Sequence, residues 1–228
     1  MCIASVADQK VEVEHIVQDA ASDDGTLEWL LKDKRAKTFV EKDEGMYDAI
    51  NRGLKKSSGE ICAHLNCDEQ YLPGTLTAVG KFFVNHPEVE ILFGDALVVD
   101  STGGFLCHRK SILPQKPHTL VSRNLSTLTC STFFRRSVFE KHALFFDPAW
   151  RILGDAEWLL RCIEQKIPMA LLNAFTSVFT NTGDNMSLRP GAQREGESFV
   201  AGAPTWWRAA KSLIIAQHRL RKLVKGVY

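Results

Sequence analysis

The stretch Glu41–Thr75, EKDEGMYDAINRGLKKSSGEICAHLNCDEQYLPGT, contains a helix, a break and a strand that ends in acidic residues. Small and apolar residues share one helical face, at Met46, Ala49, Ile50, Gly53 and Leu54. The run Ser57-Ser58-Gly59 stops the helix, and residues 61–65 are an apolar run of strand length. The pattern predicts an amphipathic helix followed by a buried strand of an α/β sheet.

Two adjacent carboxylates, Asp68 and Glu69, follow that strand in a loop, and Pro73 and Gly74 then turn the chain away. Open α/β sheets bind ligands at the carboxyl ends of their strands. Ionised neighbours repel each other, and a bound cation relieves that repulsion. Oxygen ligands suit Mg²⁺ or Mn²⁺ held by one or two carboxylates together with diphosphate oxygens. We therefore expect a metal site at Asp68 and Glu69; the alternative is a solvated acidic turn.

Composition places the chain among ordinary globular proteins, with 228 residues, 45% hydrophobic and 24% charged. The six cysteines form no CxxC pair, which favours reduced thiols in a cytoplasmic protein. No apolar run has the length of a membrane span, and we expect no signal peptide. A net charge of +1 argues against a general nucleic-acid binder.

A second motif, HIVQDAASDDGT at residues 15–26, is a strand that ends at Asp19 and leads into a polar loop. Ser22 and Asp24 carry oxygens that either cap the next helix or contact a ligand. Asp19 has no helix to cap, so a ligand contact is the better interpretation there. The next helix should bury a stripe of leucines at Leu27, Leu30 and Leu31.

The segments HIVQDAASDDGT and EKDEGMYDAINRG…SGEICAHLNCDEQYLPG, in this order, resemble the family 2 glycosyltransferases of the GT-A fold, a group that includes exopolysaccharide and cell-wall sugar transferases. The likeness is close over residues 3–76 and recurs around residues 154–162. It implies a Rossmann-like, mostly parallel sheet flanked by helices, with a small antiparallel unit on the acceptor side. It also implies a nucleotide-sugar donor, with Asp19 at the position that contacts a pyrimidine ring. Glu69 stands where relatives usually have Asp.

The chain departs from the family at its start. Members normally begin with another strand and helix, of the form sVIIPTYNR, and this sequence begins inside the helix after it. Either the N-terminus is shortened or the first strand is supplied by something else. A sheet without that strand would expose an unpaired backbone edge.

A third segment, RILGDAEWLLRCIEQ at residues 151–165, has a helical stripe at Trp158, Leu159, Cys162 and Ile163. It resembles the family's ADYDLWLR motif, in which the first acidic residue is the general base toward the acceptor hydroxyl. Asp155 matches that position, and Glu157 is the alternative. Asp155 next to Gly154 is also good helix-capping chemistry, which would explain it without catalysis.

Other elements are predicted from shorter patterns. We expect a strand over residues 91–93 closed by Gly94-Asp95, then a hairpin of residues 97–100 and 105–109. Residues 113–128 should form a long loop. The polar loop 181–187 is a candidate lid over the donor phosphates, and Arg189 and Arg194 are the nearest cations for a leaving diphosphate.

The sequence divides into a GT-A-like domain over residues 1–200 and a basic amphipathic helical tail over residues 201–228. After Glu197 there is no Asp or Glu. A basic helix with tryptophans either lies on an anionic bilayer or packs on the domain. A lipid-linked acceptor would make peripheral contact with the inner face of the membrane useful; a sugar is the other acceptor class.

The resemblance implies a metal-dependent, inverting glycosyltransferase of polysaccharide or glycoconjugate synthesis, with Asp155 as base. A nucleotidyltransferase would need a glycine-rich, basic phosphate loop near the start, which the sequence lacks. A hydrolase using Asp68 and Asp155 as a carboxylate pair stays open. So does a catalytically inactive relative that binds nucleotide sugars.

Overall fold

The structure is a computed structural model that describes residues 1–183, 185–186 and 191–227. In chain order its elements are α1 (Cys2–Ala7), β1 (Ile16–Asp19), α2 (Thr26–Leu30), β2 (Lys37–Val40), α3 (Met46–Lys56), β3 (Ile61–Ala63), β4 (Gln70–Tyr71), α4 (Thr75–Asn85), β5 (Ile91–Asp100), β6 (Phe105–Arg109), α5 (Lys116–Ser122), η1 (Thr129–Ser131), β7 (Thr132–Arg135), α6 (Ser137–Glu140), α7 (Gly154–Glu164), β8 (Met169–Asn181), α8 (Gly191–Ala201), α9 (Thr205–Ala209) and α10 (Lys211–Val224).

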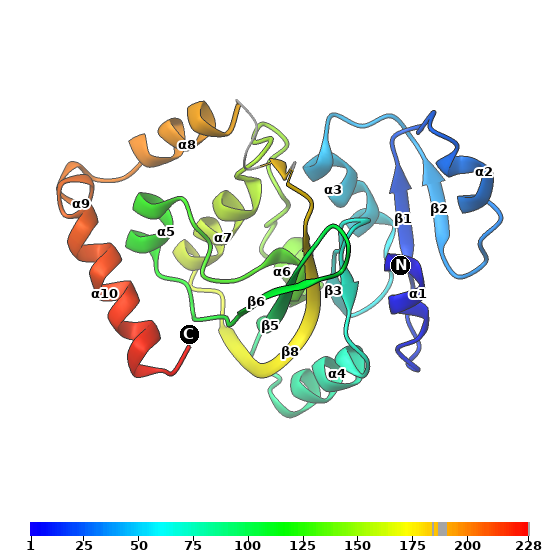
Figure 1. Cartoon of the computed structure of the whole chain (residues 1–228), viewed down its shortest axis with the longest axis horizontal. Coiled ribbons are helices and arrows are strands. Elements are labelled where there is room, and N and C mark those ends of the chain that lie inside the picture. Colours follow the sequence, from blue (N-terminus) through cyan, green and yellow to red (C-terminus); the bar gives the residue numbers. More distant parts are fainter. Residues whose placement is uncertain (184, 187–190, 228) are drawn as a thin grey trace.

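The main sheet has six strands in the order β3-β7-β5-β8-β4, with β6 paired to β5. Helices α5, α7, α8, α9 and α10 lie on one side of it in Figure 1, and β1, β2 and α2 lie on the other. The expected α/β fold is confirmed. The pairing is mixed rather than mostly parallel, because β7 runs antiparallel between β3 and β5, and β5 turns back into β6. Among the residues that the structure describes, β5 and β8 are the only strands of this sheet that pair in parallel.

Strands β1 and β2 form a separate parallel pair. Within the described residues no ladder joins β1 to β3, so each is an edge strand, in agreement with the expected unpaired edge. Side chains around α3 connect the two parts. Lys56 Nζ donates a hydrogen bond of 3.1 Å to Gln18 Oε1, and the Glu14 carboxylate accepts one from the amide of Ser58.

The core beneath the acidic loops is aromatic. Trp158 of α7 stacks on Phe146 at 5.1 Å between ring centroids, and Phe146 stacks on Tyr47 of α3 at 5.5 Å. The indole N–H of Trp158 is satisfied by the carbonyl of Leu144 at 2.7 Å. Because α3 and α7 share this stack, their N-terminal ends are held side by side.

Several sequence expectations were wrong in detail. Strand β5 continues through Gly94, since a Cβ there would lie 2.4 Å from Thr176 and only glycine allows that approach. The expected loop 113–128 contains α5. Leu31 is 57% exposed rather than buried, because α2 has already ended at Leu30.

The C-terminal helices pack on α5, but their apolar residues face two ways. Ile214 is partly buried and His218 is buried against the domain. The large apolar side chains Leu213, Leu220, Leu223 and Val224 are instead 60% to 79% exposed. The apolar residues of this tail therefore lie on two sides, and not on the single side expected of an amphipathic helix. Among the residues that the structure describes, no helix combines the length and hydrophobicity needed to cross a bilayer.

Candidate active site

The acidic loop after β3 holds one carboxylate inside the protein and one nearer the surface. Glu69 is 1% exposed, and its Oε2 accepts a hydrogen bond of 2.8 Å from the amide of Asn66. Its Oε1 is buried with no partner. Burial raises the pKa of Glu69 to about 7, and the charges of Asp68 and Asp155 add to this. Asp68 is partly exposed, and its carbonyl is fixed by the hydroxyl of Thr180 at the end of β8.

The oxygen donors here fit a magnesium or manganese ion. Among the described residues, no group of three or more His, Cys, Asp and Glu side chains has the geometry to hold a metal. Magnesium in nucleotide sites needs only one or two carboxylates, because phosphate oxygens and water complete its shell. The partly exposed carboxylate of Asp68 and the unpaired Oε1 of Glu69 meet that requirement.

Asp155 lies in the first turn of α7. Its Oδ1 accepts a hydrogen bond of 2.7 Å from the amide of Ala156. Leu153 occupies the N-cap position without a side-chain cap, so the interpretation of Asp155 as the N-cap is wrong. Burial raises the pKa of Asp155 to about 6, although hydrogen bonds from backbone amides and the Tyr47 hydroxyl oppose the rise. A carboxylate with a pKa in this range is suited to accept a proton near neutral pH.

Two residues that the sequence did not reveal hold the turn before Asp155. The hydroxyl of Tyr47 donates to the carbonyl of Ile152 at 3.1 Å, and its ring packs so closely on Gly154 that a Cβ there would lie 2.6 Å away. The carboxylate of Glu195, on α8, accepts hydrogen bonds from the amides of residues 151, 152 and 153 at 2.5, 2.7 and 2.8 Å. Glu195 thus caps this end of α7 from a distant part of the chain.

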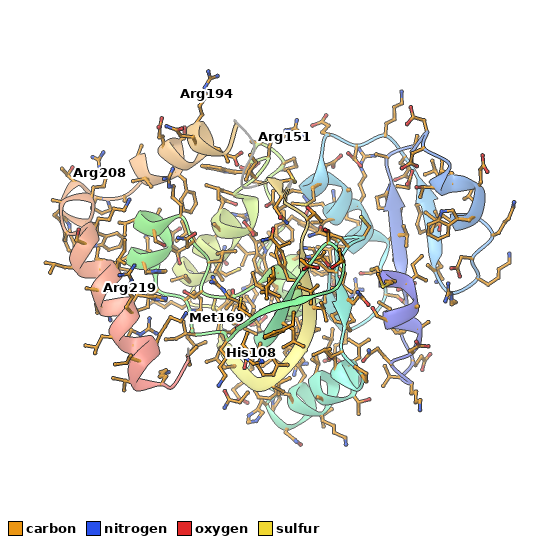
Figure 2. The ribbon with its side chains drawn as sticks, viewed as in Figure 1. His108, Arg151, Met169, Arg194, Arg208 and Arg219 are labelled. Atoms are coloured by element: carbon orange, nitrogen blue, oxygen red, sulfur yellow. The ribbon has the colours of Figure 1, made fainter. Side chains whose placement is uncertain are left out.

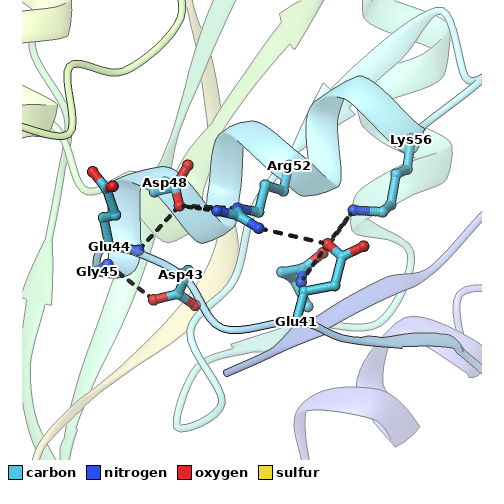
Figure 3. A network of polar contacts seen from close by, with 8 residues as sticks. Glu41, Asp43, Glu44, Gly45, Asp48, Arg52 and Lys56 are labelled. Atoms are coloured by element: carbon cyan, nitrogen blue, oxygen red, sulfur yellow. Dashed lines mark hydrogen bonds and ion pairs between the residues drawn. The ribbon is translucent and has the colours of Figure 1, made fainter. Parts of the chain in front are cut away.

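A polar network joins the loop before α3 to that helix (Figure 3). Tyr47 lies in the first turn of α3. Asp48 accepts hydrogen bonds from the amide of Glu44 and from Arg52, while Lys56 pairs with Glu41. Gly45 precedes the helix at a φ of +120°, a conformation that disfavours other residues. These contacts and this glycine fix the backbone path of the loop where it enters α3.

A cavity of about 10 Å³ lies between Asp155 and the core, large enough for about one water molecule and too small for a sugar. Its lining includes His64, whose ring meets Phe146 edge to face and whose Nδ1 has no partner. Burial lowers the pKa of His64 to about 4, so a neutral imidazole faces this space.

The residues expected to hold the nucleotide lie on the separate strand pair. Asp19 ends β1, and both of its carboxylate oxygens accept hydrogen bonds from Ser22, from the amide at 2.7 Å and from the hydroxyl at 2.8 Å. Asp24 accepts one from the amide of Thr26 at 3.0 Å, which is a capping contact at the start of α2. In the described part of the chain, no strand pairing connects these residues to the acidic loop after β3.

The other candidates are less well placed. Glu157, the alternative base, is engaged by the Arg161 guanidinium at 2.6 and 2.8 Å. Arg194 is exposed on α8 and points outward in Figure 2. Arg189 and part of the proposed lid loop lie outside the described residues. The cysteines are all free thiols, of which Cys67 and Cys107 are exposed.

Sequence comparison decides the family. The profile described as "Glycosyl transferase family 2" matches residues 1–143. The chain belongs to glycosyl transferase family 2. Its matched region contains the loops that carry Asp19, Asp68 and Glu69.

Relatives of this family 2 chain include the PGL/p-HBAD biosynthesis glycosyltransferases of Mycobacterium bovis and Mycobacterium tuberculosis, which are 26% identical over 174 residues. The match covers 71% of this chain and 62% of each relative. Solved structures of S. aureus TarS 1–349 share the fold, at 18% identity. The complex with UDP has a TM-score of 0.58 and the complex with UDP-GlcNAc 0.59, with 98% of this chain covered and 67% and 68% of those chains.

Proposed function

We propose that this chain transfers a sugar from a nucleotide-diphosphate donor to an acceptor hydroxyl, with inversion at the anomeric carbon. The main support is the meeting of two sequence-distant motifs at one place. Asp155 and Asp68 lie close enough to Glu69 for both charges to raise the pKa of that buried carboxyl. Family membership and the likeness to TarS, which binds UDP and UDP-GlcNAc in the solved complexes, agree with this proposal.

In the proposed reaction Asp155 accepts the proton of the acceptor hydroxyl as its oxygen bonds to the anomeric carbon. The bond from that carbon to the diphosphate oxygen breaks, and the nucleoside diphosphate leaves with the electron pair. Tyr47 and Glu195 hold the turn that carries Asp155. Because Asp68 and Glu69 are assigned to the metal, Asp155 is left as the base and no carboxylate is assigned as nucleophile, which favours direct displacement and hence inversion.

We assign the donor side to Asp19, Ser22, Asp24 and Asp68. Asp19 is already oriented by its two hydrogen bonds with Ser22. Asp68, with Glu69, is proposed to hold Mn²⁺ or Mg²⁺, which when bound would offset the charge that develops on the leaving diphosphate.

The acceptor is proposed to be a sugar or a lipid-linked molecule in polysaccharide or glycoconjugate synthesis. The name of the mycobacterial relatives refers to PGL/p-HBAD biosynthesis, and their identity with this chain is 26%. We also propose peripheral contact with the inner face of the membrane through α9 and α10. The exposed apolar side chains of α10 and the lack of acidic residues after Glu197 support that contact.

Donor turnover in paired variants tests the enzyme. We would measure release of nucleoside diphosphate from UDP-GlcNAc, GDP-mannose and TDP-glucose with Mn²⁺, with and without added saccharide acceptors. Asp155→Asn should lower acceptor-dependent release by about 100-fold or more, whereas Glu157→Gln, on the same helix, should retain most of it. Equal loss in both variants contradicts the assignment of the base. Release that needs no acceptor supports a hydrolase.

An inactive, nucleotide-sugar-binding relative is the second candidate, and the open edges of β1 and β3 favour it. Calorimetry with UDP, GDP and TDP in the presence of Mn²⁺ separates the two. Binding without turnover of any donor supports the inactive relative. No binding to any of the three contradicts both proposals.

A further inference from the structure

Basic side chains from β6, α5 and α10 converge where α10 packs on α5. The imidazole rings of His118 and His218 stack with centroids 3.5 Å apart and planes 12° apart, and the two residues are 6% and 7% exposed. Arg221 and Lys222 follow His218 on α10, and Arg109 approaches from the end of β6. All three cations lie near enough to disfavour a charge on both rings. Positive charge is thus gathered in the interior of this contact.

The guanidinium groups in this cluster lack anionic partners. Arg221 Nη2 donates a hydrogen bond of 3.1 Å to the carbonyl of Leu113, but its Nη1 is buried and unpaired. Arg109 donates to the carbonyl of Leu125 at 2.9 Å. Neither arginine forms an ion pair with an Asp or Glu of the described chain. Burying a charge without a counter-charge is costly, and an anion would remove that cost.

A groove of about 350 Å³ runs beside the cluster, between the start of α5 and the outer side of α10. It is lined by Gln115, Pro117, Leu213, Ile214 and Gln217. Gln217 and Arg221 are one helical turn apart on the same side of α10, so the groove leads toward the guanidinium. Its lining is apolar or carries neutral amides, and Arg221 lies one helical turn beyond the lining residue Gln217. This arrangement matches a ligand with an apolar body and an anionic head.

We propose that the groove and the cations form a binding site for a phosphate monoester carried on an apolar chain. The phosphate oxygens accept hydrogen bonds from Arg221 and Arg109, and the apolar part lies against Leu213 and Pro117. Guanidinium forks from separate elements suit a tetrahedral anion with several oxygens. A metal ion is excluded, although two histidines are present, because the neighbouring cations repel it. The site is distinct from Asp155 and from the acidic loop after β3.

Calorimetry at pH 7 and constant ionic strength tests the site with three soluble probes: inorganic phosphate, dihexanoyl phosphatidic acid and dihexanoyl phosphatidylcholine. Tighter binding of the phosphatidic acid than of phosphate assigns the site to an amphiphile. Equal binding of these two overturns the assignment to an amphiphile, because the apolar chain then contributes nothing. Failure of both to bind, or equal binding of the phosphatidylcholine, overturns the proposal.

Matched arginine variants show where the probe binds. Arg221→Gln should weaken binding of the phosphatidic acid by about tenfold or more, the usual effect of losing a charged hydrogen bond. Arg208→Gln makes the same exchange at an exposed position of α9 and should leave binding unchanged. Far-ultraviolet circular dichroism confirms that both variants fold. Equal affinity in Arg221→Gln and the unsubstituted protein overturns the assignment.

The histidine pair supplies a second readout, by NMR titration of the ring nitrogens. Burial, the neighbouring His218 and the cations Arg221, Lys222 and Arg109 lower the pKa of His118 to about 4. Burial and the same three cations, Arg221, Lys222 and Arg109, lower the pKa of His218 to about 4 as well. A phosphate bound beside them should raise both values, because an opposite charge favours the imidazolium. Measured binding with unchanged histidine titration would place the anion elsewhere and overturn the proposal.

Discussion

The hydroxyl of Tyr47 donates a hydrogen bond of 3.1 Å to the carbonyl of Ile152, three residues before Asp155. The same hydroxyl opposes the burial that raises the pKa of Asp155 to about 6. The start of α3 therefore fixes both the position and the proton affinity of the proposed base. Tyr47 is a positioning residue in this proposal, since the proton itself moves to Asp155.

The first prediction concerns the pH dependence of transfer. Asp155 must be ionised to accept a proton, so kcat/KM should rise with pH through about 6. Tyr47→Phe removes the hydroxyl that lowers the pKa of Asp155, so this acidic limb should move to higher pH. Steady-state rates measured from pH 5 to 9 provide the check.

The control for this prediction is the Asp155→Asn background. If Tyr47 acts through Asp155, adding Tyr47→Phe to Asp155→Asn should lower the remaining activity no further. An unshifted limb in Tyr47→Phe, together with additive losses in the double variant, would show that Tyr47 has only a packing role.

The second prediction concerns Glu195, which accepts hydrogen bonds from the amides of residues 151–153. Glu195→Ala leaves these amides without their acceptor and should lower the free energy of unfolding by about 1–3 kcal/mol. Glu197→Ala, two residues along the same helix at an exposed site, should change it by less than about 0.5 kcal/mol. Urea denaturation of the two variants measures the difference, and equal effects would contradict the capping role.

Local sequence patterns predicted the elements that carry their own signals. The helix over residues 46–56 and the helix over residues 154–164 follow from apolar periodicity and clear stop signals. Asp68 and Asp155 stand out in the sequence because each lies at the end of a predicted element. Asp68 follows a buried strand, and Asp155 lies at the start of a helix. Their proximity did not follow from periodicity, since residues so far apart in sequence meet only through the sheet.

Features that depend on tertiary contacts could not be predicted in this way. Glu195 caps α7 from another helix, and no local spacing relates it to residues 151–153. Helix α5 was missed because Pro114 before it, Pro117 in its first turn and the polar neighbours resemble a loop, while burial of His118 and Val121 stabilises it. Periodicity does not tell which side of a helix meets the domain, so the sequence does not predict that the leucines of α10 lie outward.

The third prediction concerns acid stability. The pKa of His118 and His218 is about 4 in the folded protein against an ordinary 6.5, so the unfolded chain takes up protons first as pH falls. Their contribution to stability should therefore be lost progressively between pH 6.5 and 4. Glu69 acts in the opposite direction, because its pKa is raised to about 7. The melting temperature of His218→Phe should fall less steeply over this range than that of the unsubstituted protein; parallel curves would contradict the assignment.

The fourth prediction tests membrane contact. Leu213, Leu220 and Val224 lie 60% to 79% exposed along one line of α10, on a segment that carries cations and no acids. The protein should therefore sediment with vesicles of phosphatidylcholine and phosphatidylglycerol but much less with phosphatidylcholine alone. Changing the three residues to Gln should abolish sedimentation at little cost in stability, because these side chains are already exposed. Val84→Gln, at an 80% exposed position on α4, is the matched control and should sediment normally. Sedimentation of the triple variant would contradict membrane contact through these residues. If the unsubstituted protein forms a dimer in analytical ultracentrifugation without lipid and the triple variant does not, the outward face binds a second copy of the chain.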